Sequence, residues 1–327
     1  MLLKIFRTTV FSFFVATQLP AAINATPVPK PVDDSARHEI PFEYTDGHMI
    51  VVRGSIGGRK NLQFVVDFGT TVTLLDRASA PALLAGETLE VTHFSNSISS
   101  AEVVVNQLEL GTMIVPNFRA YVMDLSQIPA MPQGTAGVIG LDLLKRQSVM
   151  VDFVERRLVF GASSEGEHRA SLVKCEVGYA VDALWKGIPV KLALSTGVEV
   201  VTLDQERMKG KPIKMNSVKP GTLNTNYTIT PVSYFETKDM KLSDLKFQGT
   251  GVLRKMSWPY AADELDGFLP LLALNADRVT VDFEHGVLSW EGTKMAKARS
   301  RQSNVPVQTF QDRPLTTISR QAPGFQH

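Results

Sequence analysis

Short runs in which apolar and polar residues alternate follow one another along most of the chain between residues 40 and 292. Leu89–His93 and Ala120–Met123 are two such runs. Alternation with a period of two is typical of strands that bury one face. A helical signal is limited to two short stretches, Leu141–Lys145 and Ala273–Asp277. The pattern therefore predicts an all-β protein with few short helices.

Two stretches predict β-hairpins that turn at glycine. The first runs from His48 to Val66 and has Gly57-Gly58 at its turn, and the second runs from Ala180 to Leu194 and has Trp185-Lys-Gly187 there. Glycine accepts the positive φ angles that tight hairpin turns require. Each hairpin delivers its second strand into a glycine-containing loop, so we expect the two loops to share one local structure.

The two loops belong to a longer internal duplication. Phe64–Leu75 aligns with Leu192–Leu203, which places Asp67 on Ser195, 128 residues further along. Two later blocks repeat in the same order with nearly the same separation. They are Gly137–Leu144 with Gly267–Leu274, and Val149–Val154 with Val279–Glu284. A period of about 130 residues is far longer than a solenoid repeat, so each copy is expected to form a lobe.

The polar stretches between these blocks suggest how the chain is divided. We predict, in order, a signal peptide, a flexible leader, an N-terminal lobe, a linker, a C-terminal lobe and a disordered tail. These segments are residues 1–25, 26–39, 40–161, 162–172, 173–292 and 293–327.

The N-terminus has the composition of an export signal. Lys4 and Arg7 precede the apolar run Val10–Leu19, which is shorter than the roughly 20 residues needed to span a bilayer. Small residues then offer a cleavage site between Ala22 and Ala25. We expect a secreted or periplasmic protein with no stable membrane insertion after cleavage. The alternative is an N-terminal helix that anchors the chain in a membrane or is buried.

Composition narrows the classes of function further. The chain has 327 residues, 20% of them charged, and a net charge of +1, so no strong field attracts nucleic acid. Cys175 is the single cysteine, which excludes an intrachain disulfide. The six histidines do not have metal-ligand spacing. We therefore expect no metal, no cofactor and no nucleic-acid partner, and a monomer.

The duplicated blocks resemble a known family. Phe64–Leu75 is similar to the Asp-Thr-Gly loop of the retropepsin-like and pepsin-like aspartic peptidases, and Gly137–Leu144 is similar to the hydrophobic-hydrophobic-Gly segment behind that loop. Leu192–Gly197 and Gly267–Pro270 resemble the same pair in a degraded form. The resemblance spans about residues 40 to 292. It implies a two-lobed aspartic-peptidase (acid protease) β-barrel fold with an internal duplication.

The resemblance also implies a chemistry. In the family, two carboxylates from the two loops hold one water and share a proton, because they cannot both ionise easily at close range. The ionised carboxylate takes a proton from the attacking water, and the neutral one donates to the oxyanion. Asp67 is thereby implied as a catalytic carboxylate and Ser195 as its degenerate partner position. The neighbouring substrate-binding or loop positions are Gly69, Thr70, Thr196 and Gly197.

The sequence departs from the family pattern at three positions. Ser195 replaces the second aspartate, and a hydroxyl cannot act as a base near neutral pH. Phe68 replaces a small hydroxyl residue, whereas Thr196 keeps it, so half of the cross-loop bonding can survive. Pro270 stands where the first copy has Gly140, which removes a backbone donor.

Two readings of function follow. The first is an exported protein that binds extended peptides in an inter-lobe cleft, with possible peptide-bond hydrolysis through Asp67 and a water. The alternative is a non-catalytic pseudo-peptidase, which would be a peptide-binding or inhibitor protein. A second carboxylate near Asp67, such as Glu199 or Asp204, would favour hydrolysis. The expected flaps are the turns near Asn96-Ser97 and Asn224-Thr225.

Overall fold

The computed structural model describes residues 13–15, 37–45, 47–80, 85–93, 96–128, 131–175, 178–213, 218–224, 229–256 and 264–292. Of the predicted signal peptide, only the strand β1 (Phe13–Val15) is among these residues. Most of the predicted leader and the whole of the predicted tail, residues 293–327, lie outside them. No helix in the described ranges is long and apolar enough to cross a membrane.

The described chain is mostly β-structure. The strands that begin in the first copy of the repeat are β2 (His38–Thr45), β3 (Met49–Ile56), β4 (Arg59–Val66), β5 (Leu74–Asp76), β6 (Ala85–His93), β7 (Asn96–Leu110), β8 (Met113–Met123), β9 (Thr135–Ile139), β10 (Val149–Asp152) and β11 (Arg157–Phe160). Those that follow are β12 (His168–Ser171), β13 (Val173–Cys175), β14 (Gly178–Trp185), β15 (Ile188–Ser195), β16 (Thr202–Asp204), β17 (Lys219–Asn224), β18 (Ile229–Glu236), β19 (Met240–Leu242), β20 (Leu245–Lys246), β21 (Thr250–Arg254), β22 (Gly267–Pro270), β23 (Arg278–Asp282) and β24 (Val287–Glu291).

Helices are few and short, as the sequence predicts. The α-helices of the described residues are α1 (Leu141–Leu144) and α2 (Gln205–Lys209), and the 3-10 helices are η1 (Leu125–Gln127), η2 (Thr237–Asp239) and η4 (Leu271–Leu274). The helical turn expected at Ala273–Asp277 lies earlier, because η4 ends where Asn275 takes a left-handed φ of 55°. The sequence analysis missed α2. Its signal is Asp204, whose carboxylate accepts from the backbone of the first turn.

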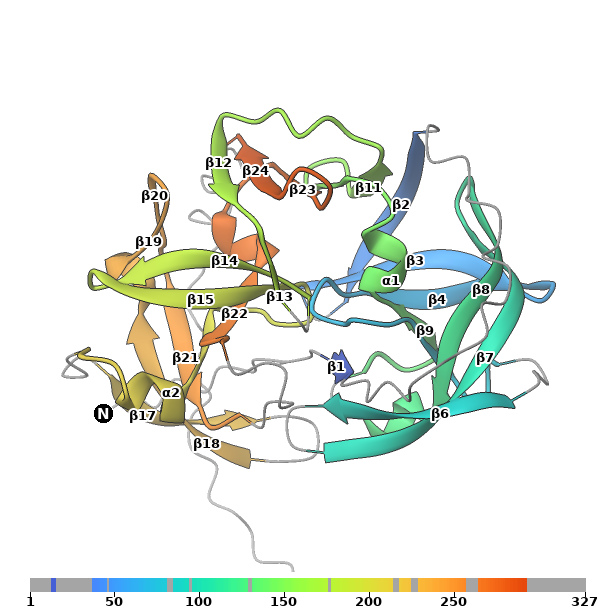
Figure 1. The fold of residues 1–327 in the computed structure, drawn as a ribbon, viewed down its shortest axis with the longest axis horizontal. Helices are drawn as coiled ribbons and strands as arrows, with labels where there is room; N and C mark the ends of the chain where they lie inside the picture. The colour runs from blue at the N-terminus through green and yellow to red at the C-terminus, as the bar shows by residue number, and fades with distance from the viewer. Residues whose placement is uncertain are drawn as a thin grey trace, which may run out of the picture.

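The strands form two sheets. In Figure 1 most of the first sheet lies on the right and the second lies on the left, while β23, β24 and β12 of the first sheet lie at the top. The first sheet has the order β1-β6-β7-β8-β5-β9-β4-β3-β2-β11-β10-β23-β24-β12, and the second has the order β17-β18-β21-β16-β22-β15-β14-β19-β20, with β13 beside β14. The lobes share the first sheet, because β10 of the first copy pairs with β23 of the second. The predicted all-β class is therefore confirmed.

The strand register confirms the internal duplication. In the first lobe β4 pairs in parallel with β9, so that Phe64 lies opposite Gly137. In the second lobe β15 pairs in parallel with β22, so that Leu192 lies opposite Gly267, its exact counterpart in the alignment. Both glycines allow a close approach. A Cβ added to Gly137 would lie 2.5 Å from the carbonyl of Leu74, and one added to Gly267 would lie 2.1 Å from that of Thr202.

The structure places strands at the ends of two segments predicted to be irregular. His168–Ser171 of the predicted linker forms β12, because it pairs with β24 at the edge of the shared sheet. The predicted leader runs to residue 39, but β2 begins at His38, which lies opposite Phe160 on β11. In both cases a sheet edge from a distant part of the chain supplies the hydrogen bonds, so local sequence does not reveal the strand.

The two predicted hairpins form as expected, and two more hairpins project from the sheets. β3–β4 turns at Gly57 and Gly58 and β14–β15 turns at Lys186 and Gly187, all with positive φ. β6–β7 and β17–β18 are the hairpins that carry the expected flaps, and Asn96 begins β7 while Asn224 ends β17. Both hairpins extend toward the middle of the molecule in Figure 1.

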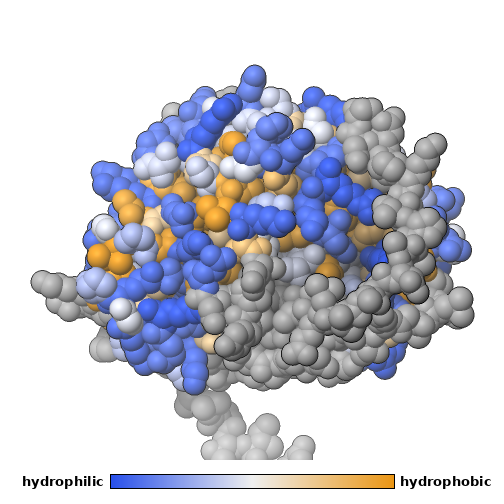
Figure 2. All heavy atoms as spheres, in the orientation of Figure 1, coloured by the Kyte–Doolittle hydropathy of each residue, from blue (hydrophilic) through white to orange (hydrophobic). Residues whose placement is uncertain are grey.

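One buried apolar cluster extends through both lobes. It includes Phe64 and Val66 of β4 and Leu192 and Leu194 of β15, the strands that carry the duplicated loops. On the surface, Figure 2 shows apolar residues gathered across the middle of the described face, with polar residues around them. The duplicated loops are therefore held from beneath by a continuous core and not by each lobe alone.

Candidate functional site

Asp67 and Ser195 meet at the junction of the lobes. Asp67 follows β4, and its N–H donates to the carbonyl of Ile139 on β9 at 3.0 Å. Ser195 is the last residue of β15, the equivalent strand of the second lobe. The Ser195 hydroxyl donates to Oδ1 of Asp67 at 3.0 Å. The structure thus brings the two aligned positions into direct contact, although 128 residues separate them.

The loop of the first lobe folds back onto its own carboxylate. The N–H of Gly69 donates to Oδ1 of Asp67 at 2.9 Å, and the hydroxyl of Thr70 donates to Oδ2 at 2.8 Å. Bonds from a side-chain carboxylate to the backbone two residues later stabilise a tight turn. Gly69 and Thr70 therefore hold the conformation of the Asp67 side chain.

The loop of the second lobe also donates to Asp67. The N–H groups of Thr196 and Gly197 lie 3.0 Å and 3.1 Å from Oδ1 of Asp67. The same N–H of Gly197 also lies 3.0 Å from the Ser195 hydroxyl oxygen. All six residues predicted for the site thus come together. The single carboxylate therefore receives donors from both loops.

Burial dominates the electrostatics of this carboxylate. Asp67 and Ser195 both have an exposed fraction of 0%. Burial raises the pKa of Asp67 above its ordinary value, and the bonds from Gly69, Thr70, Thr196 and Ser195 oppose that rise. Asp67 is therefore a fully enclosed acid whose oxygens are held by hydrogen-bond donors from both loops.

Neither of the acids considered as a second carboxylate bonds to Asp67. Asp204 instead accepts from Glu206 N and Arg207 N at the start of α2, and from Met256 N at 3.0 Å. Glu199 is exposed. The hydrogen-bond partners of Asp67 include no carboxyl group, so the site as described contains one acid.

The residues that follow Asp67 and Ser195 join the loops in two different ways. The hydroxyl of Thr196 donates to the carbonyl of Val66 at 2.7 Å and lies 3.3 Å from the N–H of Phe68. Phe68 packs its ring into the core, where it stacks on Phe283 with a centroid distance of 6.2 Å and an interplanar angle of 17°. Half of the cross-loop bonding therefore survives, and aromatic packing occupies the other half.

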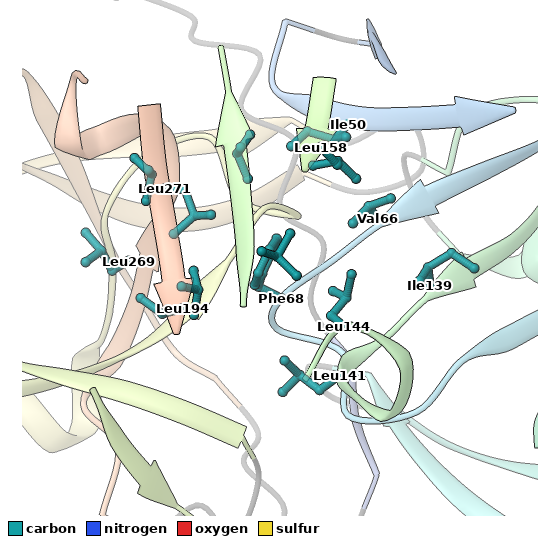
Figure 3. Packing of buried hydrophobic residues seen from close by; sticks show 14 of the residues in the cluster. Ile50, Val66, Phe68, Ile139, Leu141, Leu144, Leu158, Leu194, Leu269 and Leu271 are labelled. Carbon is teal, nitrogen blue, oxygen red and sulfur yellow. The ribbon is translucent and has the colours of Figure 1, made fainter. Parts of the chain in front are cut away.

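Figure 3 shows how Phe68 lies between the lobes. Its ring stands between Leu194 and Leu271 of the second lobe and Val66 and Leu144 of the first. An aromatic ring of this size contributes mainly through the apolar area that it buries. The substitution of Phe68 for a small hydroxyl residue therefore exchanges a polar contact for a hydrophobic one at the lobe junction.

A polar group behind the first loop was missed by the sequence analysis. The hydroxyl of Thr73 donates to Oδ1 of Asp142 at 2.7 Å, and the N–H of Thr73 donates to Oδ2 at 2.9 Å. The N–H of Gly140 in turn donates to the Thr73 hydroxyl at 3.1 Å. These bonds attach the segment after Asp67 to the start of α1.

The second lobe has replaced this group completely. The aligned residues are Val201 for Thr73, Leu272 for Asp142 and Pro270 for Gly140. Proline has no N–H, and valine and leucine offer no side-chain polar atom. The three residues that hydrogen-bond to one another in the first lobe are thus replaced in the second lobe by residues that cannot form these bonds. This joint replacement is the sequence signal that could have revealed the group.

The residues that the structure describes contain no cluster of histidine, cysteine, aspartate or glutamate arranged to hold a metal ion.

Comparison with known proteins places this geometry in context. A family model described as aspartyl protease matches residues 52–143. The crystal structure of an aspartic proteinase from Irpex lacteus is similar with a TM-score of 0.50 and 13% identity, covering 77% of this chain and 96% of that one. Basic 7S globulin from soybean is similar with a TM-score of 0.47 and 12% identity, covering 80% of this chain and 95% of that one. No curated protein sequence matches the chain.

The family model covers the lobe that contains Asp67 and ends within α1. The similarity to the Irpex lacteus proteinase extends over both lobes, but the sequence identity is low. It therefore shows the fold of this chain and not its activity. The chain therefore has the two-lobed fold of the aspartic peptidases, with Asp67 and Ser195 at the two equivalent loop positions.

Proposed function

We propose that this protein binds an extended peptide between its lobes without cleaving it, and that Asp67 joins the two loops instead of activating water. The observation that carries the proposal is the environment of the Asp67 carboxylate. It has no exposed surface and accepts five hydrogen bonds of 3.1 Å or shorter, three of them from the second loop.

A general base must contact the water whose proton it removes. Oδ1 of Asp67 already accepts from Gly69, Ser195, Thr196 and Gly197, and Oδ2 accepts from Thr70. A carboxylate offers about four lone-pair positions. Because four donors from the two loops occupy Oδ1 and the side chain has no exposed surface, Asp67 is better suited to stabilising the loops than to activating water.

Ser195 does not restore the missing function. In a two-carboxylate site one acid is neutral and the other ionised, because like charges at close range cannot both ionise easily. A serine hydroxyl does not titrate in this range and cannot exchange roles with Asp67. Here the Ser195 hydroxyl is directed at Asp67 itself. The pair therefore has one titrating group where a two-carboxylate site has two, which favours a binding protein over a hydrolase.

Peptide binding is supported by β1, an N-terminal strand that forms the edge of the first sheet. β1 pairs antiparallel with β6, with Phe13 opposite His93 and Val15 opposite Val91. An exposed strand edge is a common site for recognition of extended peptides by strand addition. Removal of the expected signal peptide, residues 1–25, would free this edge of β6 for a peptide partner. We infer on the same basis that the protein acts after export, outside the cell or in a periplasm.

Hydrolysis through Asp67 and a water is the second candidate. It is favoured by the direction of the Asp67 pKa, which burial raises above its ordinary value. Perturbed carboxyl groups of this kind are frequent at catalytic sites, although structural networks also perturb them. The two candidate functions predict different effects of Asp67→Asn on peptide cleavage. The amide keeps the shape of the side chain but cannot act as a base, so it would abolish hydrolysis through Asp67.

The first experiment compares wild type with Asp67→Asn on a mixed-peptide library from about pH 3 to about 7, the range in which aspartic carboxyl groups work. We expect neither protein to release new peptide termini, as measured by mass spectrometry. Cleavage by wild type that disappears in Asp67→Asn would overturn the proposal and establish hydrolysis. Cleavage that is equal in both proteins would exclude Asp67 as its source.

The second experiment measures binding. The same library is captured on immobilised protein that begins at residue 26, and the retained peptides are then titrated by fluorescence anisotropy. We expect affinity to fall when alternate backbone N–H groups of a bound peptide are methylated, because strand addition uses those groups. Retained peptides that tolerate methylation at every position would show that strand addition is not the binding mode.

A further inference from the structure

The strands that join the two lobes are related by an approximate two-fold axis. β10 pairs antiparallel with β23, and Met150 lies opposite Thr280, which is its own counterpart in the repeat. Two residues toward one end of this pairing, Asp152 lies opposite Arg278. Because the two-fold relation exchanges the strands, the sequence positions equivalent to Asp152 and Arg278 must meet again at the other end.

The first end is fastened by an ion pair between the lobes. The Asp152 carboxylate is buried, and Nε of Arg278 donates to its Oδ2 at 3.0 Å. The N–H groups of Val154 and Glu155 donate to Oδ1 at 3.1 Å and 2.9 Å. Both oxygens of the buried carboxylate therefore have partners, and one partner is a charged group of the other lobe. We call the pair of Asp152 and Arg278 the anchor.

The other end cannot form the equivalent ion pair, because Ser148 stands in the place of the arginine. Asp282 stands in the place of the buried aspartate. Its carboxylate accepts from the N–H of His285 at 3.0 Å and lies 2.9 Å from Nδ1 of the same residue, within one lobe. The Ser148 hydroxyl donates to the carbonyl of Ala162 at 2.5 Å. Both positions therefore have partners other than each other.

The segment after β11 crosses the sheet at this second end. Residues 162–166, which we call the strap, lie on the path from β11 to β12 at the top of Figure 1. The Ser164 hydroxyl donates to the carboxylate of Asp282, which ends β23. Gly166 lies against β24, because a Cβ added to it would be 3.1 Å from Cβ of Ser289. The strap thus begins at a contact with the first lobe and continues along the second.

Exposure along the strap alternates from residue to residue. Ala162, Ser164 and Gly166 are half-buried, whereas Ser163 and Glu165 are exposed. A period of two is that of an extended chain with one face on a surface. The half-buried positions are the ones that contact the sheet. The polar stretch that the sequence predicts as a linker therefore lies along the sheet as an extended segment.

We propose that the strap fastens the two lobes at the end of the shared sheet where the repeat lacks its second ion pair. It connects Ser148 of the first lobe with Asp282 of the second, which lie just beyond the pairing of Val149 with Val281. Opening of the lobes at this end must break both hydroxyl bonds, whereas opening at the anchor must separate charged groups. The lobes therefore open from the strap end and pivot at the anchor. This role does not depend on which ligand the protein takes.

Hydrogen exchange resolved by residue in the full chain tests the proposal. Ser148→Ala with Ser164→Ala removes both hydroxyl bonds of the strap and leaves the backbone pairing of β10 with β23 in place. We expect the amides that join these strands at residues 149–150 and 280–281 to exchange about tenfold faster than in wild type, because two hydrogen bonds no longer oppose opening. The N–H of Phe153, which donates across the lobes at 2.9 Å beside the anchor, should keep its protection.

Ser163→Ala is the matched control. It makes the same change on the outward face of the strap, where the hydroxyl oxygen accepts from the N–H of Glu165 at 3.3 Å, and it should leave exchange at both ends as in wild type. Equal protection of wild type and the double variant at residues 149–150 and 280–281 would overturn the proposal. Faster exchange by the same factor at Phe153 would also overturn it, because the strap would then stabilise the whole fold and not one end.

A rescue variant tests the same relation from the opposite direction. Ser148→Arg with Ser164→Ala puts an arginine at the position equivalent to Arg278, beside the Asp282 carboxylate. A second ion pair between the lobes can then replace the strap contacts. We expect exchange at the strap end to return to within about threefold of wild type. Exchange as fast as in the double alanine variant would show that the strap does not stand in for an ion pair, and the proposal would be wrong.

Discussion

The two loops at the lobe junction have the same backbone course and different chemistry. The first carries Asp67 and Phe68, and the second carries Ser195 and Thr196 at the same positions. The first loop supplies the shared carboxyl group and a large apolar ring, whereas the second supplies hydroxyl and N–H donors to that carboxyl group. The comparison teaches that a symmetric fold can divide one task between its halves, with an acceptor on one side and donors on the other.

The residues behind the two loops also differ, because they are polar in the first lobe and apolar in the second. Thr73 and Asp142 bond to each other in the first lobe, while Val201 and Leu272 pack there in the second. A polar network must be satisfied in full, and an apolar one needs only volume. The first lobe therefore depends on specific bonds, and each bond removed should cost more there than an equivalent change in the second.

Removal of the shared carboxylate should have the largest effect. Asp67→Ala removes the acceptor of the Gly69 and Thr196 N–H groups and of the Ser195 and Thr70 hydroxyl groups in a buried site, while the N–H of Gly197 keeps the Ser195 hydroxyl oxygen. Each unsatisfied donor costs about 1–3 kcal/mol, offset in part by relief of the buried charge, so we expect a loss of about 4 kcal/mol in the free energy of unfolding. Urea denaturation followed by tryptophan fluorescence measures it.

Asp67→Asn is the matched control for this prediction. The amide has the same shape and keeps one acceptor oxygen, so its loss should be about 1–2 kcal/mol. If Asp67→Ala costs no more than Asp67→Asn, the carboxylate does not hold the two loops together and the proposed division of roles between them is wrong.

The aromatic half of the junction comes next in magnitude. Phe68→Ala removes a ring that is buried against Phe283 and leaves a cavity between the lobes, for which we expect a loss of about 3 kcal/mol. Phe68→Leu retains most of the apolar volume and should cost about 1 kcal/mol. Equal losses for alanine and leucine would indicate that the ring is not part of the packed junction.

Much of this arrangement was predictable from the sequence because the duplication fixes it. The period-two runs predict the strands, and the alignment of Asp67 with Ser195 predicts that the two residues meet, as they do at 3.0 Å. The family resemblance predicts a two-lobed aspartic-peptidase fold, and this chain is similar in structure to the Irpex lacteus proteinase. These predictions rest on patterns that occur twice within the chain, so a substitution in one copy does not hide the pattern in the other.

Other features depended on contacts between distant residues and were missed. β12 exists because β24 offers it an edge, and the residues of β12 have no strand pattern of their own. The number of donors to Asp67 depends on where the N–H groups of the second loop point, which composition does not encode. The aspartate Asp142 looked unremarkable because its partner Thr73 lies 69 residues earlier. Side-chain roles that need geometry in three dimensions could not be derived from spacing alone.

The smallest predicted effect concerns the surviving half of the cross-loop bonding. Thr196→Val removes the hydroxyl that donates to the Val66 carbonyl and accepts from the Phe68 N–H, at similar volume. We expect a loss of about 1–2 kcal/mol, measured by urea denaturation, with faster hydrogen exchange at the Phe68 amide. Thr70→Val is the matched variant, because its hydroxyl bonds within one lobe and its loss should leave the Phe68 amide protected. If both variants expose that amide equally, Thr196 has no special role between the lobes, and the first loop would owe its position to Asp67 and the core alone.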